Sequence, residues 1–347
     1  MFNFGELAMK KSLIALAVLG LSSAAAMAQS SATLYGVADA GVGRIKSTDF
    51  TSAGVLGANL KGSSSPDNNG KTQFISGSLM NYRDSRLGVR GVEDLGGGLN
   101  VGFNFEAGLD LDDGGTTTGS NFWARQANMQ IGGNWGTVKL GRMYTPTYVT
   151  MLTWELTGNA NYSVLGNTYK YNGLGSRANS AFGYITPTFA GLTAVVGYVT
   201  KNDNVDASGT GHDVWDVALM YGNGPLAAGA SVSKVKDYKT SYQIGGKYTF
   251  GDYFKLAASY SQASDAASGM NTIRRGFELG GTAMYGPFSL TLDVTRDTKN
   301  AWALDGKKYT NGIVEVEYKL SKRTFLYGAY LRVNGRNNYG LGIDHSF

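Results

Sequence analysis

The residue types that could carry out catalysis or bind a metal are scarce in this chain of 347 residues. It has no cysteine and two histidines, His212 and His345. A hydrolase needs a nucleophile with a general base, which is usually histidine. His212 lies in a glycine-rich stretch with no Gly-x-Ser-x-Gly motif beside it. Two histidines without cysteine are also too few ligands for a typical zinc site. The sequence therefore predicts no metal, no cofactor and no catalytic residue.

Arginines placed in stretches of alternating polarity are the stronger chemical signal. Arg86 and Arg90 alternate with Leu87 and Val89, so both arginines share one face of a strand. A guanidinium group stays charged and presents a planar fork that suits carboxylate and phosphate. The formal net charge is only +5, and Lys and Arg are scattered along the chain. A nucleic-acid partner, which would need a dense basic patch, is therefore not predicted.

The elements that must position these side chains are strands. Alternation of apolar and polar residues runs from residue 29 to the end, as in 288–295 and 314–320. Side chains of a strand point alternately to opposite faces, so each stretch has one apolar and one polar face. Seven short turns and eight longer links separate the stretches, which predicts sixteen strands. About 20 residues per strand and link leave room for the 9–11 residues that a spanning strand needs.

Aromatic residues gather at the predicted strand ends, as in the interfacial girdle of a membrane barrel. They are Tyr221, Tyr248, Phe250, Phe254, Tyr260, Tyr285, Phe288, Tyr318, Phe325 and Tyr327. The same parity puts Tyr330 on the inner face. The chain has 50 glycines and 16% charged residues, against about 25% charged residues in soluble domains. We predict an all-β fold, a closed transmembrane antiparallel β-barrel of sixteen strands with short periplasmic turns and long extracellular loops. An exported β-sandwich or solenoid is the alternative.

The first residues resemble an export signal. Lys10 and Lys11 precede the apolar run 13–21, and an Ala-x-Ala site ends at Ala28. We expect a signal peptide at residues 1–28, with Met9 as the true start and residues 1–8 as a start-codon artefact. A buried N-terminal helix is the alternative. Residues 29–347 would then form a single barrel domain.

The last strand carries a second export-related pattern. Tyr339, Leu341, Ile343, His345 and the terminal Phe347 share one face. This pattern resembles the assembly signal of outer-membrane proteins, a final strand that ends in Phe with aromatic or apolar residues at alternate positions.

Four blocks of sequence resemble a known family. They are 33–41 (TLYGVADAG), 85–99 (SRLGVRGVEDLGGGL), 136–142 (GTVKLGR) and 177–180 (RANS), which leads to 187–191 (PTFAG). On these blocks the chain resembles the sixteen-stranded trimeric general porins of β-proteobacteria. The resemblance implies a water-filled channel for passive diffusion of small hydrophilic solutes and ions. It also implies a homotrimer in the outer membrane of a Gram-negative bacterium, reached by Sec-type export. The implied partners are outer-membrane lipids, lipopolysaccharide and the barrel assembly machinery, which would read Phe347.

The resemblance also implies that the third long link, residues 144–176, folds into the pore. This link is rich in apolar and aromatic residues, which a loop left in water seldom is. They are Tyr144, Tyr148, Met151, Leu152, Trp154, Tyr162, Leu165, Tyr169 and Tyr171. An exposed loop that packs on neighbouring loops or subunits is the alternative.

Matching the family motifs position by position places an arginine cluster at the constriction. Arg86, Arg125 and Arg177 fall where anion-selective members carry arginines, and Glu106 and Glu155 fall where acidic residues oppose them. Arg90 and Lys139 are further residues of the lumen wall. Each arginine has an alternative reading as a salt-bridge partner in the wall. The parity of Arg125 with Met129 and Ile131 would put it outside unless the strand has a bulge.

The sequence thus predicts a diffusion channel with a modest anion preference set by charges at the constriction. Acidic and basic residues are mixed over the remaining lumen, so the constriction has to decide the preference. A substrate-specific channel for sugars or organic acids is the alternative, although it usually has an aromatic ladder along the lumen. An outer-membrane barrel enzyme is a further alternative function.

Overall fold

The computed structural model describes residues 31–46, 70–117, 121–170, 174–204, 210–266, 269, 271–303 and 305–347. The predicted signal peptide, residues 1–28, lies outside the described residues, as do the expected start at Met9 and the artefact at residues 1–8. Among the described residues, no helix is both long enough and apolar enough to cross a membrane.

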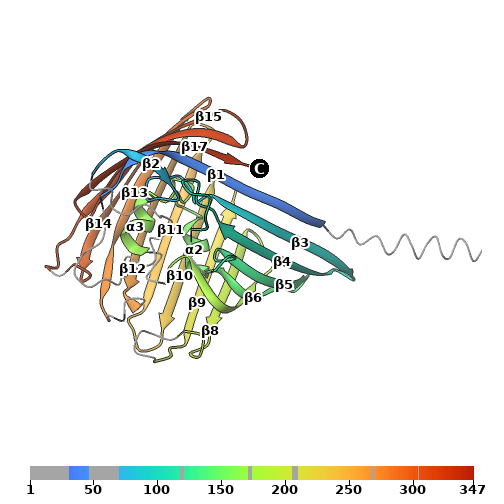
Figure 1. The fold of residues 1–347 in the computed structure, drawn as a ribbon. Helices are drawn as coiled ribbons and strands as arrows, with labels where there is room; N and C mark the ends of the chain where they lie inside the picture. Colours follow the sequence, from blue (N-terminus) through green and yellow to red (C-terminus); the bar gives the residue numbers. More distant parts are fainter. Residues whose placement is uncertain are drawn as a thin grey trace, which may run out of the picture.

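The described chain is a ring of antiparallel strands with two short helices inside it (Figure 1). The strands are β1 (Ser31–Arg44), β2 (Gln73–Ser76), β3 (Arg86–Gly96), β4 (Leu99–Gly108), β5 (Gln126–Gly133), β6 (Gly136–Tyr144), β7 (Arg177–Ile185), β8 (Leu192–Val199), β9 (Val214–Asn223), β10 (Leu226–Val235), β11 (Ser241–Phe250), β12 (Phe254–Ser264), β13 (Ile273–Tyr285), β14 (Phe288–Asn300), β15 (Thr310–Lys319), β16 (Thr324–Val333) and β17 (Arg336–Ser346). The helices are α2 (Pro146–Met151) and α3 (Val164–Tyr169).

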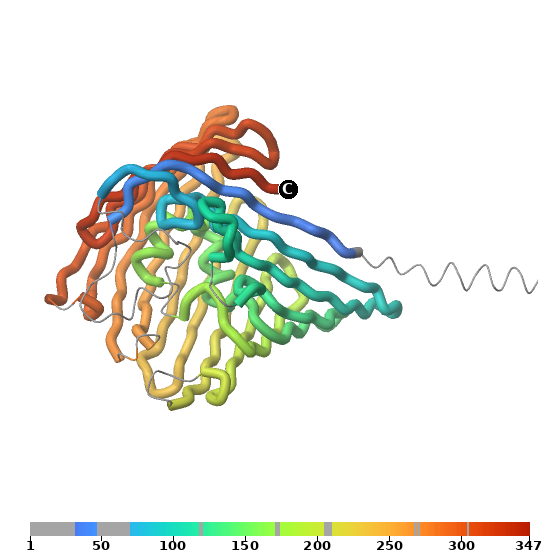
Figure 2. Tube along the Cα trace, viewed as in Figure 1, coloured from blue at the N-terminus to red at the C-terminus, as the bar shows by residue number. Residues whose placement is uncertain are grey.

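The barrel closes through its first and last strands. β1 pairs with β17 on one side, from Val37 opposite Ser346 to Arg44 opposite Tyr339, and with β3 on the other. Figure 2 shows the first and last strands running side by side. The four-residue β2 lies in the first long link and pairs with β1. The other sixteen strands form the closed wall, which confirms the predicted sixteen-stranded barrel.

Short turns join the strands at one end of the barrel and long links join them at the other. Between β3 and β4 the chain reverses at Gly96, Gly97 and Gly98, whose φ angles are +79°, +63° and +81°. These left-handed conformations are strained for residues with a side chain, which explains the glycine run.

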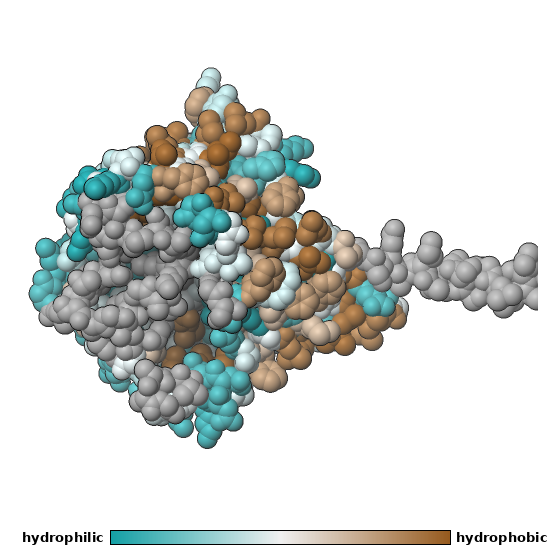
Figure 3. Space-filling view, in the orientation of Figure 1, coloured by the Kyte–Doolittle hydropathy of each residue, from teal (hydrophilic) through white to brown (hydrophobic). Residues whose placement is uncertain are grey.

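Alternation in the strands separates an outer apolar face from an inner polar face. On β14, Leu292 is 51% exposed and Val294 is 44% exposed, whereas Asp293 and Thr295 are fully buried. An outer surface of exposed aliphatic and aromatic side chains suits lipid rather than water. Figure 3 shows apolar side chains over the barrel wall and hydrophilic side chains toward the end with the long links.

One strand has the opposite parity to the predicted one. On β16, Tyr330 faces outward, with 44% of its surface exposed, while Tyr327 is 3% exposed and faces inward. The Tyr327 hydroxyl donates a hydrogen bond to Asp39 on β1 (2.6 Å). The expected place of Tyr327 in the outer girdle, and of Tyr330 in the lumen, is therefore wrong. Both faces of this strand are apolar, so alternation does not distinguish them.

The third long link lies inside the barrel, against the inner wall (Figure 1). Thr145 caps α2 by accepting a hydrogen bond from the Tyr148 amide, and Pro146 starts the helix. Ser163 caps α3 in the same way. Trp154 and Tyr162 are fully buried, which accounts for the apolar residues of the link.

Candidate functional site

The described part of the third link is fixed to the wall by both polar and apolar contacts. The Thr147 amide and hydroxyl donate to the Asp216 carboxylate on β9 (2.8 and 2.7 Å). Trp154 lies against Gly245 on β11, where no side chain intervenes. At the far end, Thr168 shares a hydrogen bond with Thr295 on β14 (2.8 Å). The link therefore narrows the lumen toward the opposite wall, which is built from β1 and β3 to β7.

Two of the predicted arginines meet one carboxylate on that opposite wall. Arg125 Nε donates to Glu106 Oε1 (2.8 Å), and Arg86 Nε lies 3.7 Å from Glu106 Oε2. Arg125 Nη1 also donates to Asp84 (2.6 Å). Burial opposes the charge of Arg125, but Asp84 and Glu106 outweigh it and raise the pKa of this guanidinium above its ordinary value. Glu106 thus lies among the arginines on the same wall instead of facing them across the lumen.

Arg125 points inward because it precedes its strand. β5 begins at Gln126, and the Arg125 amide donates to the Glu106 carbonyl at the strand margin (3.1 Å). Gln126 and Asn128 face inward and Met129 faces outward, so alternation starts only after Arg125. Parity counted from Met129 therefore gives the wrong face for this residue.

Arg177 forms a separate group with two tyrosines of the third link. Its Nη2 donates to the Tyr144 hydroxyl (3.2 Å), and its guanidinium lies 4.7 Å from the centre of the Tyr144 ring. Tyr144 stacks on Tyr148, with the ring centres 4.9 Å apart. Burial raises the pKa of Tyr148, so its hydroxyl stays protonated at neutral pH. The partners of Arg177 in the described chain are the hydroxyls of Ser176 and Tyr144 and the Tyr144 ring, and none of them is a carboxylate.

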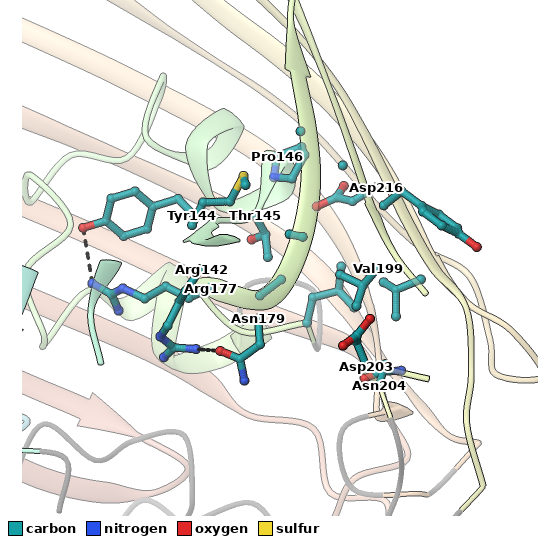
Figure 4. A pocket seen from close by; sticks show the side chains of 18 of the residues that line it. Arg142, Tyr144, Thr145, Pro146, Arg177, Asn179, Val199, Asp203, Asn204 and Asp216 are labelled. Atoms are coloured by element: carbon teal, nitrogen blue, oxygen red, sulfur yellow. Dashed lines mark hydrogen bonds between the residues drawn. The ribbon is translucent and has the colours of Figure 1, made fainter. Parts of the chain in front are cut away.

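Sequence reasoning missed Arg142 as a site residue. Alternation places it on the face of Leu140, which is exposed on the outside. Its guanidinium instead donates to the Ala124 carbonyl and the Asn179 side chain, and it lines a cavity with Arg177 (Figure 4). The pairing of β6 with β7 shifts register between Gly141 and Met143. No sequence signal marks this shift, apart from the glycine at 141 with φ +118°.

Glu155 lies in the third link and is 4% exposed. Its carboxylate accepts hydrogen bonds from the Thr157 hydroxyl (2.5 Å) and the Asn159 amide (2.6 Å). The Asn159 side chain in turn donates to the Tyr148 hydroxyl (2.6 Å). Glu155 therefore stabilises the turn that supports Tyr148, and within the described chain it forms no ion pair with the arginines.

The two predicted wall residues both face the lumen. Arg90 is exposed, and its guanidinium lies 4.9 Å from the centre of the Tyr35 ring. Lys139 is half-buried on β6 and lines the same cavity as Arg177. Neither forms an ion pair with a carboxylate among the described residues.

Acidic and basic side chains of the lumen differ sharply in exposure. The carboxylates of Asp216, Glu278, Asp293 and Glu315 are at most 3% exposed. The lysines Lys139, Lys247 and Lys255 are half-buried, and Lys319 is exposed. Among the acids, Glu317 is also half-buried. Lys247 reaches the backbone of the third link and donates to the Glu155 carbonyl (3.3 Å). Four of the acids that balance the lumen charge in the sequence are therefore covered, whereas the four lysines are half-buried or exposed.

The remaining candidates for chemistry form no catalytic or metal-binding group with these residues, although His212 lines the same cavity as Arg177. His212 lies before β9 at the end with the long links and contacts Asp237 (3.3 Å), whereas His345 lies near the C-terminus at the other end. Asp110, Asp112 and Asp113 bring carboxylate oxygens within 4.8 Å of one another in the link after β4. Acidic residues in such loops commonly cluster without an ion, so we assign no metal to them.

A closed barrel with an apolar outer face, a polar lumen and an inward-folded link defines a membrane channel of the outer-membrane type. Residues 15–338 match the sequence model of the Gram-negative porin family, and the chain belongs to this family. It is therefore an outer-membrane porin of a Gram-negative bacterium and not an enzyme.

Relatives and solved structures agree with this membership. The chain is 34% identical to outer membrane porin protein 32 of Delftia acidovorans, over 96% of this chain and 92% of that protein. It is 28% identical to the major outer membrane protein P.IB of Neisseria gonorrhoeae, over 91% of each chain. The anion-selective porin from Comamonas acidovorans superposes with a TM-score of 0.70 at 25% identity, over 92% of this chain and 100% of that one.

Proposed function

We propose that this porin prefers anions and that the charges beside the third link set the preference. The observation that carries the proposal is the difference in exposure between the two signs of charge. Arg86, Arg90 and Arg177 reach the lumen, whereas most of the acidic residues lie covered. A low-dielectric wall lined by one sign of charge raises the local concentration of the opposite ion. The printed description of the Comamonas porin as anion-selective supports the same preference.

The constriction in this proposal contains Arg86, Arg125 and Arg177 on one side and the third link with Glu155 on the other. Arg142 joins the basic side, and Glu106 lowers its net charge. Small hydrophilic solutes and ions would cross by passive diffusion. A sugar channel would need a row of aromatic side chains along the lumen, and Tyr330 does not contribute to such a row because it faces outward. Liposome swelling with neutral sugars against organic anions of equal size would separate a sugar channel from the proposed one.

Reversal potentials in planar bilayers test the preference. In a KCl gradient we expect the potential to favour Cl⁻, and Arg86→Glu to move it toward K⁺, because the substitution reverses one charge beside Glu106. Arg323→Glu makes the same charge change in an exposed turn outside the lumen and serves as the matched control. A cation-selective wild-type channel would overturn the proposal. An unchanged potential in Arg86→Glu would place Arg86 away from the constriction.

We also propose that the channel works as a homotrimer, surrounded by outer-membrane lipids and lipopolysaccharide. Porins of this barrel type are expected to form trimers, and closure of single units in three equal conductance steps would support this assembly. Recognition by the barrel assembly machinery would use the last strand, in which Tyr339, Leu341, Ile343 and Phe347 all face outward. Cleavage after Ala28 would release the chain during export, and mass spectrometry of the mature N-terminus would test it.

A further inference from the structure

A side cavity of about 950 Å³ opens beside the third link, at the long-link end of β6 to β9. Figure 4 shows Arg142, Tyr144 and Arg177 along one part of its lining and Val199 along another. Its volume lies within the range of about 300–1,000 Å³ that is typical of sites for small organic molecules. The cavity shares Arg142 and Arg177 with the proposed constriction, whereas Arg86, Glu106 and Arg125 do not line it.

The two arginines of this cavity lack acidic partners. Arg125 forms ion pairs with Glu106 and Asp84, and Arg274 forms one with Asp297. In the described part of the chain, no carboxylate forms an ion pair with Arg142 or Arg177.

One hydrogen-bond donor of Arg177, its Nε, is not used within the described chain. Its Nε is buried and has no hydrogen-bond partner among the described residues, while Nη1 and Nη2 donate to Ser176 and Tyr144. An unpaired buried donor is costly, and two neighbouring guanidinium groups repel each other. An anion beside Arg142 and Arg177 would remove both costs.

The wall beside the arginines is apolar. Met143, Ala181 and Val199 form a buried cluster, and Val195 and Pro146 extend the lining. Inorganic anions gain nothing from such a wall, whereas an apolar group gains about 25 cal/mol for each Å² that it removes from water. Asp203 and Asp216 also line the cavity, but they accept hydrogen bonds from threonines and leave the arginines free.

We propose that this cavity binds monocarboxylates with a bulky apolar body, of which benzoate is a simple example. The carboxylate would lie against Arg142 and Arg177, and the ring against the cluster of Met143, Ala181 and Val199. The inference rests on the proposed anion preference and adds a class of solute to it. The channel would slow such an anion during passage, because it binds at a site beside the pore.

The experiment measures the current of single channels in symmetric KCl while benzoate, acetate or benzyl alcohol is added to one side. Acetate has the charge without the apolar body, and benzyl alcohol has the body without the charge. We expect benzoate to reduce the current at a concentration at least about tenfold below that needed for acetate, and benzyl alcohol to have no effect.

Two kinds of variant assign the effect to the cavity. Arg177→Gln and Arg142→Gln should each raise the half-blocking concentration of benzoate by about tenfold, because each removes a charged partner of the carboxylate. Val195→Asn should raise it for benzoate and leave it unchanged for acetate. Arg323→Gln removes the same charge far from the cavity and should have no effect. A far-ultraviolet circular dichroism spectrum equal to that of the wild-type barrel shows that a variant has folded.

Equal half-blocking concentrations for benzoate and acetate would overturn the inference, and so would an undiminished benzoate effect in both arginine variants. Block by benzyl alcohol at the same concentration as benzoate would likewise contradict it. The KCl reversal potential of the wild-type channel is read separately. A cation-selective value would reject the proposed anion preference itself, whereas an anion-selective channel without benzoate block would reject only the cavity.

Discussion

At the scale of single residues, Glu106 is the carboxylate that lies between two arginines of the proposed constriction. Its carboxylate lies beside Arg86 and accepts hydrogen bonds from the Arg125 guanidinium and from the Tyr35 hydroxyl (3.0 Å). One acid thus offsets part of two cations, and Asp84 offsets more of Arg125. The structure therefore divides the arginines into a paired group, Arg86 and Arg125, and an unpaired group, Arg142 and Arg177.

We expect Glu106→Gln to strengthen the anion preference. The amide keeps the size and some hydrogen bonds of the carboxylate but removes the charge between Arg86 and Arg125. We expect the Cl⁻ to K⁺ permeability ratio to rise by roughly two- to fivefold, which corresponds to about 0.4–1 kcal/mol in a water-filled site. Reversal potentials measure the ratio. Glu93→Gln, at an exposed position near a short turn, is the control, and an equal rise in that variant would contradict the explanation.

Residue spacing predicted some of these positions and failed for others, for physical reasons. Arg86 and Arg90 lie within a regular strand, so alternation was enough to place them on the inner face. Arg125 lies one residue before β5, and Arg142 lies beside the register shift between β6 and β7. Alternation holds only where a strand is continuous, so it could not place these two side chains.

At the scale of elements, the third link is held by the wall that it covers. Its apolar and aromatic content predicted that it would not be left in water, but not which strands would receive it. That choice depends on glycines of the wall, such as Gly245 and Gly280, which leave room for Trp154 and Leu156. The same limit applied to β16, where apolar residues on both faces hid the direction of Tyr327.

We expect Gly245→Ala to push the third link away from β11. A Cβ atom at this position would lie 2.5 Å from two ring carbons of Trp154 and 2.8 Å from Ser259. Overpacking of this kind costs about 1–3 kcal/mol. The single-channel conductance should change, and the melting temperature of the folded barrel should fall. Gly246→Ala is the matched control, because its nearest neighbours lie 3.5 Å away. Identical behaviour of the two variants would show that Trp154 does not fix the link.

At the scale of the whole molecule, acids of the inner wall such as Asp216 are covered by the third link, whereas Lys139 is half-buried and Lys319 is exposed. This asymmetry acts through water and salt, so its reach depends on ionic strength. We expect the anion preference to weaken when the mean KCl concentration rises from 0.1 to 1 M at a constant gradient ratio, because the screening length falls from about 10 to about 3 Å. Reversal potentials at several concentrations measure this change. A preference independent of salt would point to size or direct binding instead.

Closure of the barrel gives a second prediction at this scale. Phe347 continues β17 by exchanging two backbone hydrogen bonds with Gly36 (3.1 Å each), and its ring covers this glycine. A Cβ atom at Gly36 would lie 2.3 Å from the Phe347 ring and 2.8 Å from the Arg86 carbonyl. We expect Gly36→Ala to lower the melting temperature of the barrel and slow its assembly. Gly222→Ala, with no atom within 4 Å of the added Cβ, should do neither; equal losses in both would contradict this account.

The pairing of β1 with β17 also decides when folding can finish. The strand that completes the ring, β17, pairs with the first strand of the described barrel, so the two partners lie at opposite ends of the described chain. A chain that lacks its final eleven-residue strand would have two open edges, and each edge would carry a row of unpaired amide and carbonyl groups into hydrocarbon. Insertion into the membrane thus depends on β17, since only a barrel that contains this strand has no exposed edge in hydrocarbon.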